Sequence, residues 1–115
     1  MNNNIEKIAE AIRNKRPIEF NYHREGKKIG KRIGWPHIIF SGFTKEQEFR
    51  TWLHLVQTEG VSDTLDIFPD WRMFIVNYIS NVEILYNRPK FEPFEGYNPE
   101  SDLYKGTKII EKVSQ

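Results

Sequence analysis

The sequence predicts a mainly β domain, a small β-barrel that is preceded by one short helix and followed by an irregular arm. A chain of 115 residues has room for one hydrophobic core of ordinary size but not for two. Its apolar residues recur at helical spacing near the start, and at every second position in the segment that follows. Further short apolar runs, linked by turn-forming residues, continue to residue 85, and this succession is typical of a small barrel.

Residues 1–16 are expected to hold the single helix. Apolar side chains recur on one helical face, at Ile5, Ile8, Ala9 and Ile12. Asn4 is suited to cap the amino-terminal end of this helix. Pro17 stops it, because proline disfavours helical backbone in the residue that precedes it.

Residues 17–85 are expected to form the barrel. The first strand runs from Ile18 to Tyr22, where apolar and polar side chains alternate. A turn at residues 23–26 leads into a second strand, Lys28 to Trp35, and Pro36 is predicted to begin a separate third strand that ends at Phe40. The remaining apolar runs predict strands at residues 49–58, 71–76 and 79–85.

Residues 86–115 are expected to form a C-terminal arm within the same single domain, which spans residues 1–115. Pro89, Pro93 and Pro99 lie among aromatic side chains, so residues 86–102 predict an ordered segment without regular secondary structure. The apolar residues at 109, 110 and 113 fit either a final strand or a helix.

The composition points to the cytoplasm and away from several classes of site. The chain has no cysteine, so it has no disulfide framework, no thiolate nucleophile and no cysteine-based zinc site. The start of the chain is polar and lacks an apolar stretch of signal-peptide or membrane-span length. We therefore expect a cytoplasmic location.

The charges are divided unevenly along a chain whose formal net charge is only +1. Residues 13–32, the basic segment, hold eight basic side chains against two acidic ones. Four acidic side chains crowd a later stretch, the acidic loop, at Glu59, Asp63, Asp66 and Asp70. Such an asymmetry attracts phosphate groups to the basic segment. The alternative is that its lysines protect a hairpin edge from pairing with another sheet.

Several of these segments together resemble WYL domains. Residues 11–22 resemble the opening of the family, and residues 32–39 resemble its second and third strands. Thr51-Trp52-Leu53 occupies the place of the tryptophan-tyrosine-leucine tripeptide that names the family, and residues 71–79 resemble its closing segment. Tyr78 stands where the family usually has an arginine. The tail, with Gly96-Tyr97-Asn98-Pro99, is similar to a subgroup of short stand-alone bacterial members.

The resemblance implies an SH3-like (Sm-like) β-barrel that binds nucleotides, oligonucleotides or single-stranded nucleic acid. In larger members the module follows a winged-helix DNA-binding domain and acts as its sensor, and many members occur in bacterial transcription regulation and phage defence. The present chain has no room for that second domain. It is expected to work alone, as an oligomer, or with a separate protein.

Two arginines and one histidine are the candidates for contacting an anionic ligand. Arg32 and Arg72 offer planar guanidinium groups that match phosphate, and the resemblance supports both positions. The alternative is that they form structural ion pairs with the acidic loop. His37 is a candidate donor to the same ligand, although a single histidine in a barrel is more often a hydrogen-bonded structural residue.

Aromatic and amide side chains supply the remaining candidates. Tyr22, Trp52 and Trp71 are candidate platforms for stacking on bases, and two of the three are expected in the core. Trp71, beside the acidic loop, is the one expected to be exposed. Gln57 either contacts a base edge or caps the backbone of a loop.

No pattern in the sequence indicates catalysis, a metal or a cofactor. The chain lacks a glycine-rich phosphate loop and a nucleophile elbow, so we expect a protein that is not an enzyme. The acidic loop does not have the spacing of a calcium site, and the three histidines lack the spacing of a zinc site.

Two functions remain after these exclusions. The first is a regulatory module that binds a nucleotide or single-stranded nucleic acid through a basic and aromatic surface of the barrel. The second is a protein-interaction or oligomerisation module that uses the aromatic, proline-rich arm to hold a partner or a second copy, provided that the arm does not fold back over its own barrel.

Overall fold

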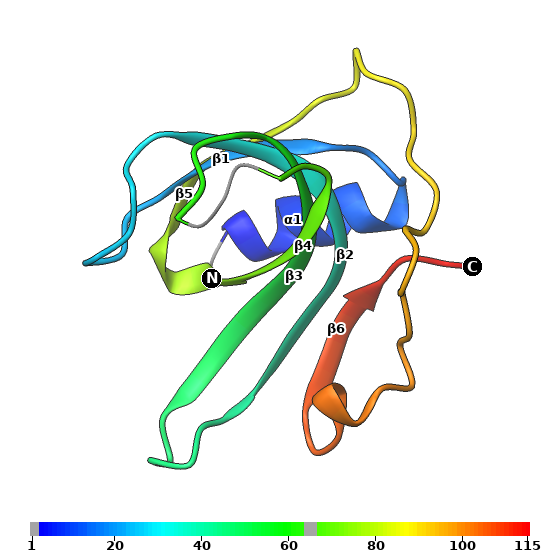
Figure 1. Cartoon of the computed structure of the whole chain (residues 1–115). Coiled ribbons are helices and arrows are strands. Elements are labelled where there is room, and N and C mark those ends of the chain that lie inside the picture. Colours follow the sequence, from blue (N-terminus) through cyan, green and yellow to red (C-terminus); the bar gives the residue numbers. More distant parts are fainter. Residues whose placement is uncertain (1–2, 64–66) are drawn as a thin grey trace.

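The computed structural model describes residues 3–63 and 67–115, so Asp66 of the acidic loop and the first two residues lie outside the described part. The chain forms one α-helix, six strands and two short 3₁₀ turns (Figure 1). Their bounds are α1 (Asn3–Arg13), β1 (Ile18–Tyr22), β2 (Lys31–Phe43), β3 (Phe49–Gly60), β4 (Asp70–Ile75), η1 (Val76–Tyr78), β5 (Ile79–Ile84), η2 (Asp102–Tyr104) and β6 (Lys108–Lys112). The predicted mainly β fold with an N-terminal helix is confirmed.

The six strands form one antiparallel sheet in the order β4-β3-β2-β1-β5, with β6 paired to β2. In the described part of the chain no pairing joins the edge strands β4 and β5, so the hydrogen-bonded sheet is open. η1 connects these two edge strands directly.

The helix α1 packs its apolar face against the sheet. Ile8, Ala11 and Ile12 are fully buried, and they join the core formed by β1, β3, β4 and β5. The helix ends at Arg13, before Pro17, as expected. Asn4 lies inside the helix instead of capping it, and its side-chain amide donates a hydrogen bond to the carbonyl of Ile79 at 2.9 Å. No helix in the described ranges is long and apolar enough to cross a membrane.

The strand β2 corrects one prediction, because Pro36 lies inside it and does not begin a separate strand. One edge of β2 is shared by two partners: β1 pairs with residues 31–34 and β6 pairs with residues 38–41. Pro36 lies in the gap between these partners, next to an irregularity in the pairing with β3. Proline lacks a backbone N–H, so the gap is a position where it interrupts no ladder hydrogen bond.

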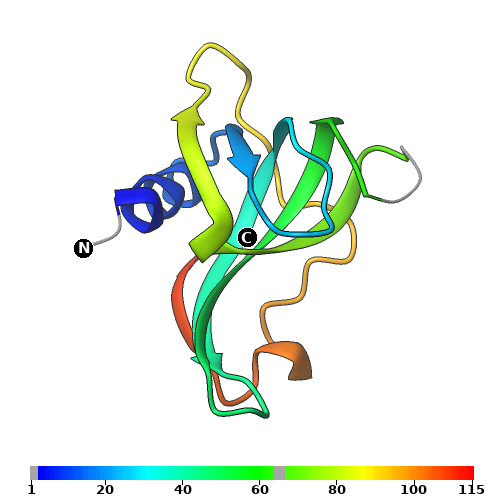
Figure 2. The same cartoon turned by 90° about the vertical axis from the view of Figure 1, so that its left-hand side faces the viewer.

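The C-terminal arm folds back on its own sheet. Figures 1 and 2 show it leaving β5 at one end of the molecule and returning as β6 at the other. Phe91 donates its N–H to Lys15 at 3.0 Å, and the hydroxyl of Tyr97 donates to the carbonyl of Val113 at 2.8 Å. The segment is irregular up to η2, as predicted. The residues at its end, for which both a strand and a helix were predicted as alternatives, form a strand, β6.

Candidate functional site

A small basic pocket lies beside β1, β2 and β4. It has a volume of about 130 Å³. Its lining contains four basic side chains and one acidic one, together with an aromatic and apolar floor: Tyr22, Arg24, Lys27, Arg32, Asp63, Arg72, Met73 and Phe74. The fold therefore brings three predicted site residues, Tyr22, Arg32 and Arg72, to one pocket.

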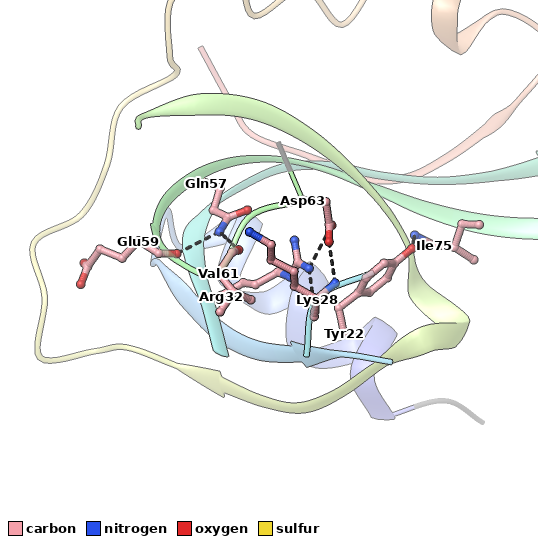
Figure 3. A network of polar contacts seen from close by, with 8 residues as sticks. All are labelled: Tyr22, Lys28, Arg32, Gln57, Glu59, Val61, Asp63 and Ile75. Atoms are coloured by element: carbon pink, nitrogen blue, oxygen red, sulfur yellow. Dashed lines mark hydrogen bonds and ion pairs between the residues drawn. The ribbon is translucent and has the colours of Figure 1, made fainter. Parts of the chain in front are cut away.

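Arg32 is held at the inner wall of the basic pocket (Figure 3). It is only 1% exposed, and its Nη2 donates to the carbonyl of Lys28 and to the carboxylate of Asp63, both at 3.0 Å. Its guanidinium also lies 5.3 Å from the ring centroid of Phe74. Its Nε–H has no acceptor among the described residues, so the buried cation keeps unused donor capacity.

Asp63 ties the acidic loop to the basic segment. Its second carboxylate oxygen accepts the backbone N–H of Lys28 at 2.6 Å. Partial burial acts to raise the pKa of Asp63, but the bonds from Lys28 and Arg32 outweigh it and hold the pKa below its usual value. Arg32 therefore forms the ion pair with the acidic loop that was the alternative to anion binding. This ion pair lies within the basic pocket.

Arg72 makes a weaker pair at the mouth of the pocket. Its Nη1 donates to the carboxylate of Asp70 at 2.8 Å and to the carbonyl of Trp71 at 3.0 Å. The hydrogen bond from Arg72 is the main reason why the pKa of Asp70 lies below its usual value. The Asp70 side chain is about half exposed, so water screens its attraction to Arg72 and an incoming anion can compete with it.

Arg24 and Lys27 add positive charge at the basic pocket, and the charge of Lys27 also helps to lower the pKa of Asp63. Both are exposed, and neither forms an ion pair with a described residue. The guanidinium of Arg24 lies 5.9 Å from the ring centroid of Tyr78. Both residues belong to the basic segment but were not predicted as site residues, because a run of charge does not show which side chains converge.

Tyr22 is a wall of the pocket and not a stacking platform. Its ring packs edge-on against Phe74, with centroids 4.9 Å apart, and the residue is 2% exposed. Its hydroxyl accepts the backbone N–H of Ile75 at 3.0 Å. The ring faces are therefore occupied by the core, which corrects the prediction of base stacking at this residue.

His37 is a structural residue, which corrects its prediction as a ligand donor. It is fully buried, with Nδ1 placed 2.8 Å from the carbonyl of Trp35, and its Nε2 accepts the N–H of Phe94 at 3.0 Å. Both ring nitrogens are thereby used, in the neutral form with the proton on Nδ1. Desolvation is the main reason why the pKa of His37 falls to about 4.

Gln57 and Trp71 also serve the fold. Gln57 is fully buried, and its amide donates to the carbonyls of Glu59 and Val61 at 3.0 and 2.7 Å, as the loop-capping alternative expected. Trp71 is half-buried rather than exposed, because its indole N–H donates to the carbonyl of Glu95 in the arm at 2.9 Å. Neither residue lines the basic pocket.

Comparisons with known proteins assign the chain to no family. No family model, no curated protein and no solved structure matches the chain. Within residues 3–63 and 67–115, no group of three or more metal-ligating side chains is assembled.

Proposed function

We propose that the chain is a non-catalytic regulatory module that binds the phosphate of a nucleotide or of single-stranded nucleic acid in the basic pocket. The observation that carries this proposal is the convergence of Arg24, Lys27, Arg32 and Arg72 on one small pocket in which Asp63 is the one carboxylate among the described residues. A surplus of cations beside an apolar wall favours an anion, because low-dielectric walls strengthen the local potential.

The size of the pocket selects the part of the ligand that enters it. Pockets for whole drug-sized ligands measure roughly 300–1,000 Å³. The basic pocket, at about 130 Å³, is smaller and is suited to one phosphate group. The sugar and base of a bound nucleotide therefore lie outside it, and the pocket reads charge and not sequence.

The resemblance to WYL domains and the strand order support the same class of protein. η1 holds the ends of β4 and β5 close together, and these are the two edges that an SH3-like barrel brings together. In this proposal the module acts in the cytoplasm, alone, as an oligomer, or with a separate protein.

The test removes the two cations of the basic pocket that form no ion pair with a described residue. Fluorescence anisotropy of labelled single-stranded and duplex DNA is measured with the wild type and with the Arg24→Ala/Lys27→Ala double variant. Preferential binding of single strands, weakened about tenfold or more by the double variant, is expected.

A matched control removes two positive charges elsewhere. Lys90 and Lys112 are both exposed and do not line the basic pocket, so the Lys90→Ala/Lys112→Ala variant has the same net charge as the test variant. Equal losses in the two variants would assign binding to general charge, and no binding by the wild type at low salt would overturn the proposal.

The alternative function in the arm loses its main support. Phe91 and Tyr104 are buried against the chain's own sheet, and Phe94 and Tyr97 are half-buried there. These aromatic side chains are therefore not free to hold a partner in this conformation.

A further inference from the structure

A second hollow, which we call the hairpin groove, opens between the β2–β3 hairpin and the arm. Its volume is about 390 Å³. It is lined by Phe40, Phe43, Thr44, Lys45, Trp52, Met73, Leu103, Lys105 and Thr107. Phe43 is 68% exposed and Leu103 is 52% exposed, so large apolar side chains face solvent at this groove.

We propose that the hairpin groove takes a nucleobase of the same single strand whose phosphate occupies the basic pocket. This inference rests on the proposed function and adds to it a site for the base. It makes single-stranded nucleic acid of more than one nucleotide the ligand.

Met73 connects the two hollows. It is the one described residue that lines both the basic pocket and the hairpin groove. It lies on β4 between Arg72 and Phe74, which both line the basic pocket. Side chains alternate along a strand, so Arg72 and Phe74 face one side of the sheet and Met73 faces the other. Because β4 is an edge strand, a nucleic-acid strand anchored at Arg72 reaches the groove by crossing this edge at Met73, an unbranched apolar side chain that adapts to different neighbours.

The groove offers an aromatic surface that is already ordered. Trp52 is half-buried, and it stacks on Phe40 with the ring centroids 5.5 Å apart and the planes inclined by 27°. Phe40 is in turn fixed by an edge-on contact with Tyr104, at 5.0 Å. A base that stacks here meets rings whose conformational freedom is already lost, which favours binding.

The charges at the groove favour a nucleic acid over an apolar protein surface. Lys45 and Lys105 line the groove and are exposed, and neither makes an ion pair with a described residue. Among the described residues, no acidic side chain lines the groove. Aromatic rings with a cationic border provide both contacts that a single strand requires, one for its bases and one for its flanking phosphates.

The test separates the base from the phosphates. Affinities are measured for a short oligothymidylate and for an abasic strand with the same number of phosphates, using wild type, Phe43→Ser and Leu103→Ser. Stacking predicts that the wild type binds the base-bearing strand roughly five- to 150-fold more tightly. Both variants are expected to reduce this ratio, while the affinity for the abasic strand stays unchanged.

The matched control is Ile29→Ser. Ile29 is an exposed large apolar residue, 78% exposed, that lines neither hollow. The ratio is expected to stay at the wild-type value in this variant. Competition by inorganic pyrophosphate, which has no base, measures anion binding in the basic pocket separately from base binding in the groove. Sedimentation of the free protein measures its self-association.

The outcomes distinguish the two proposals. Equal affinities for the two strands, with pyrophosphate still competing, would overturn the base site and leave the phosphate site standing. Absence of binding by both strands and by pyrophosphate would overturn both. If Phe43→Ser changed the association state of the free protein and left the ratio intact, the groove would be a contact between copies, and the base site would be overturned.

Discussion

Burial keeps His37 neutral, and this makes the stability of the fold sensitive to acid. Its pKa of about 4 lies below the usual value of 6.5, so the unfolded chain takes up a proton at a pH where the folded chain does not. The stability contributed by the neutral ring is complete above pH 6.5 and is lost as the pH falls towards 4. Burial lowers the pKa of the neighbouring His54 as well, which acts in the same direction.

We expect the free energy of unfolding to fall by about 3 kcal/mol through His37 alone as the pH decreases from about 7 to about 4. Urea unfolding followed by tryptophan fluorescence measures this change. His37→Gln should be less stable at neutral pH, because Phe94 loses its acceptor. The same variant should show a shallower pH dependence, and an unchanged pH dependence would contradict the assignment.

Asp63 occupies the side of Arg32 that a phosphate would contact, so it acts as an internal anion. We expect Asp63→Asn to bind pyrophosphate more tightly and to be less stable without it, by about 2–4 kcal/mol, because a buried guanidinium loses its counter-charge. Thermal unfolding at increasing pyrophosphate concentration tests both effects. A larger stabilisation by pyrophosphate in Asp63→Asn than in wild type is the expected result, and a smaller one would contradict it.

At the scale of single residues, the sequence predicted which side chains can contact an anion better than it predicted where those side chains lie in the fold. Arg32 and Arg72 were predicted as residues of one site, and the structure places both in the lining of the basic pocket. His37 was misassigned, because the N–H of Phe94 that its Nε2 accepts comes from a segment 57 residues further along the chain. Arg24 and Lys27 were missed as site residues for a similar reason, since convergence on a pocket is a tertiary property.

At the scale of elements, local apolar patterns were sufficient for most strands and insufficient for β6. The strands β1, β3, β4 and β5 are close to the predicted ranges. Alternate burial is clear in β1 and in the first half of β3, whereas β4 and β5 were predicted from short apolar runs. The apolar residues at 109, 110 and 113 fit two periods, and the choice is made by pairing with residues 38–41 of β2. Pro36 was interpreted as a boundary because a change of partner along one edge leaves no local signal.

Phe91 links the arm to the rest of the fold. It is 4% exposed, and its ring contacts those of Trp35 and His37 with centroids 6.0 and 5.1 Å apart. We expect Phe91→Ala to lower the free energy of unfolding by about 3–5 kcal/mol in urea titrations. Leu103→Ala, in the same arm but exposed, should change it by less than about 0.5 kcal/mol. Similar values for both variants would show that the arm is not part of the cooperative core.

At the scale of the whole molecule, the near-neutral net charge conceals a localised cationic surface. With one phosphate in the basic pocket and one beside each of Lys45 and Lys105, three phosphates are neutralised, and the slope of log affinity against log salt should be about −2. The Arg24→Ala/Lys27→Ala variant should have a slope that is shallower by about 0.7, because the phosphate contact in the basic pocket is lost. Binding isotherms at several salt concentrations measure both slopes, and an unchanged slope in the variant would place the phosphates elsewhere.

The divided edge of β2 has a consequence for how the chain matures on the ribosome. Residues 38–41 acquire their partner on that edge only from residues 108–112, which are made some seventy positions later. At roughly 5–20 residues per second, this half of the edge waits several seconds for its partner. Until then, backbone donors and acceptors beside Ile38 and Phe40 are open to strands of other nascent chains. The segment that waits for its partner during synthesis is therefore one whose side chains are buried in the finished molecule.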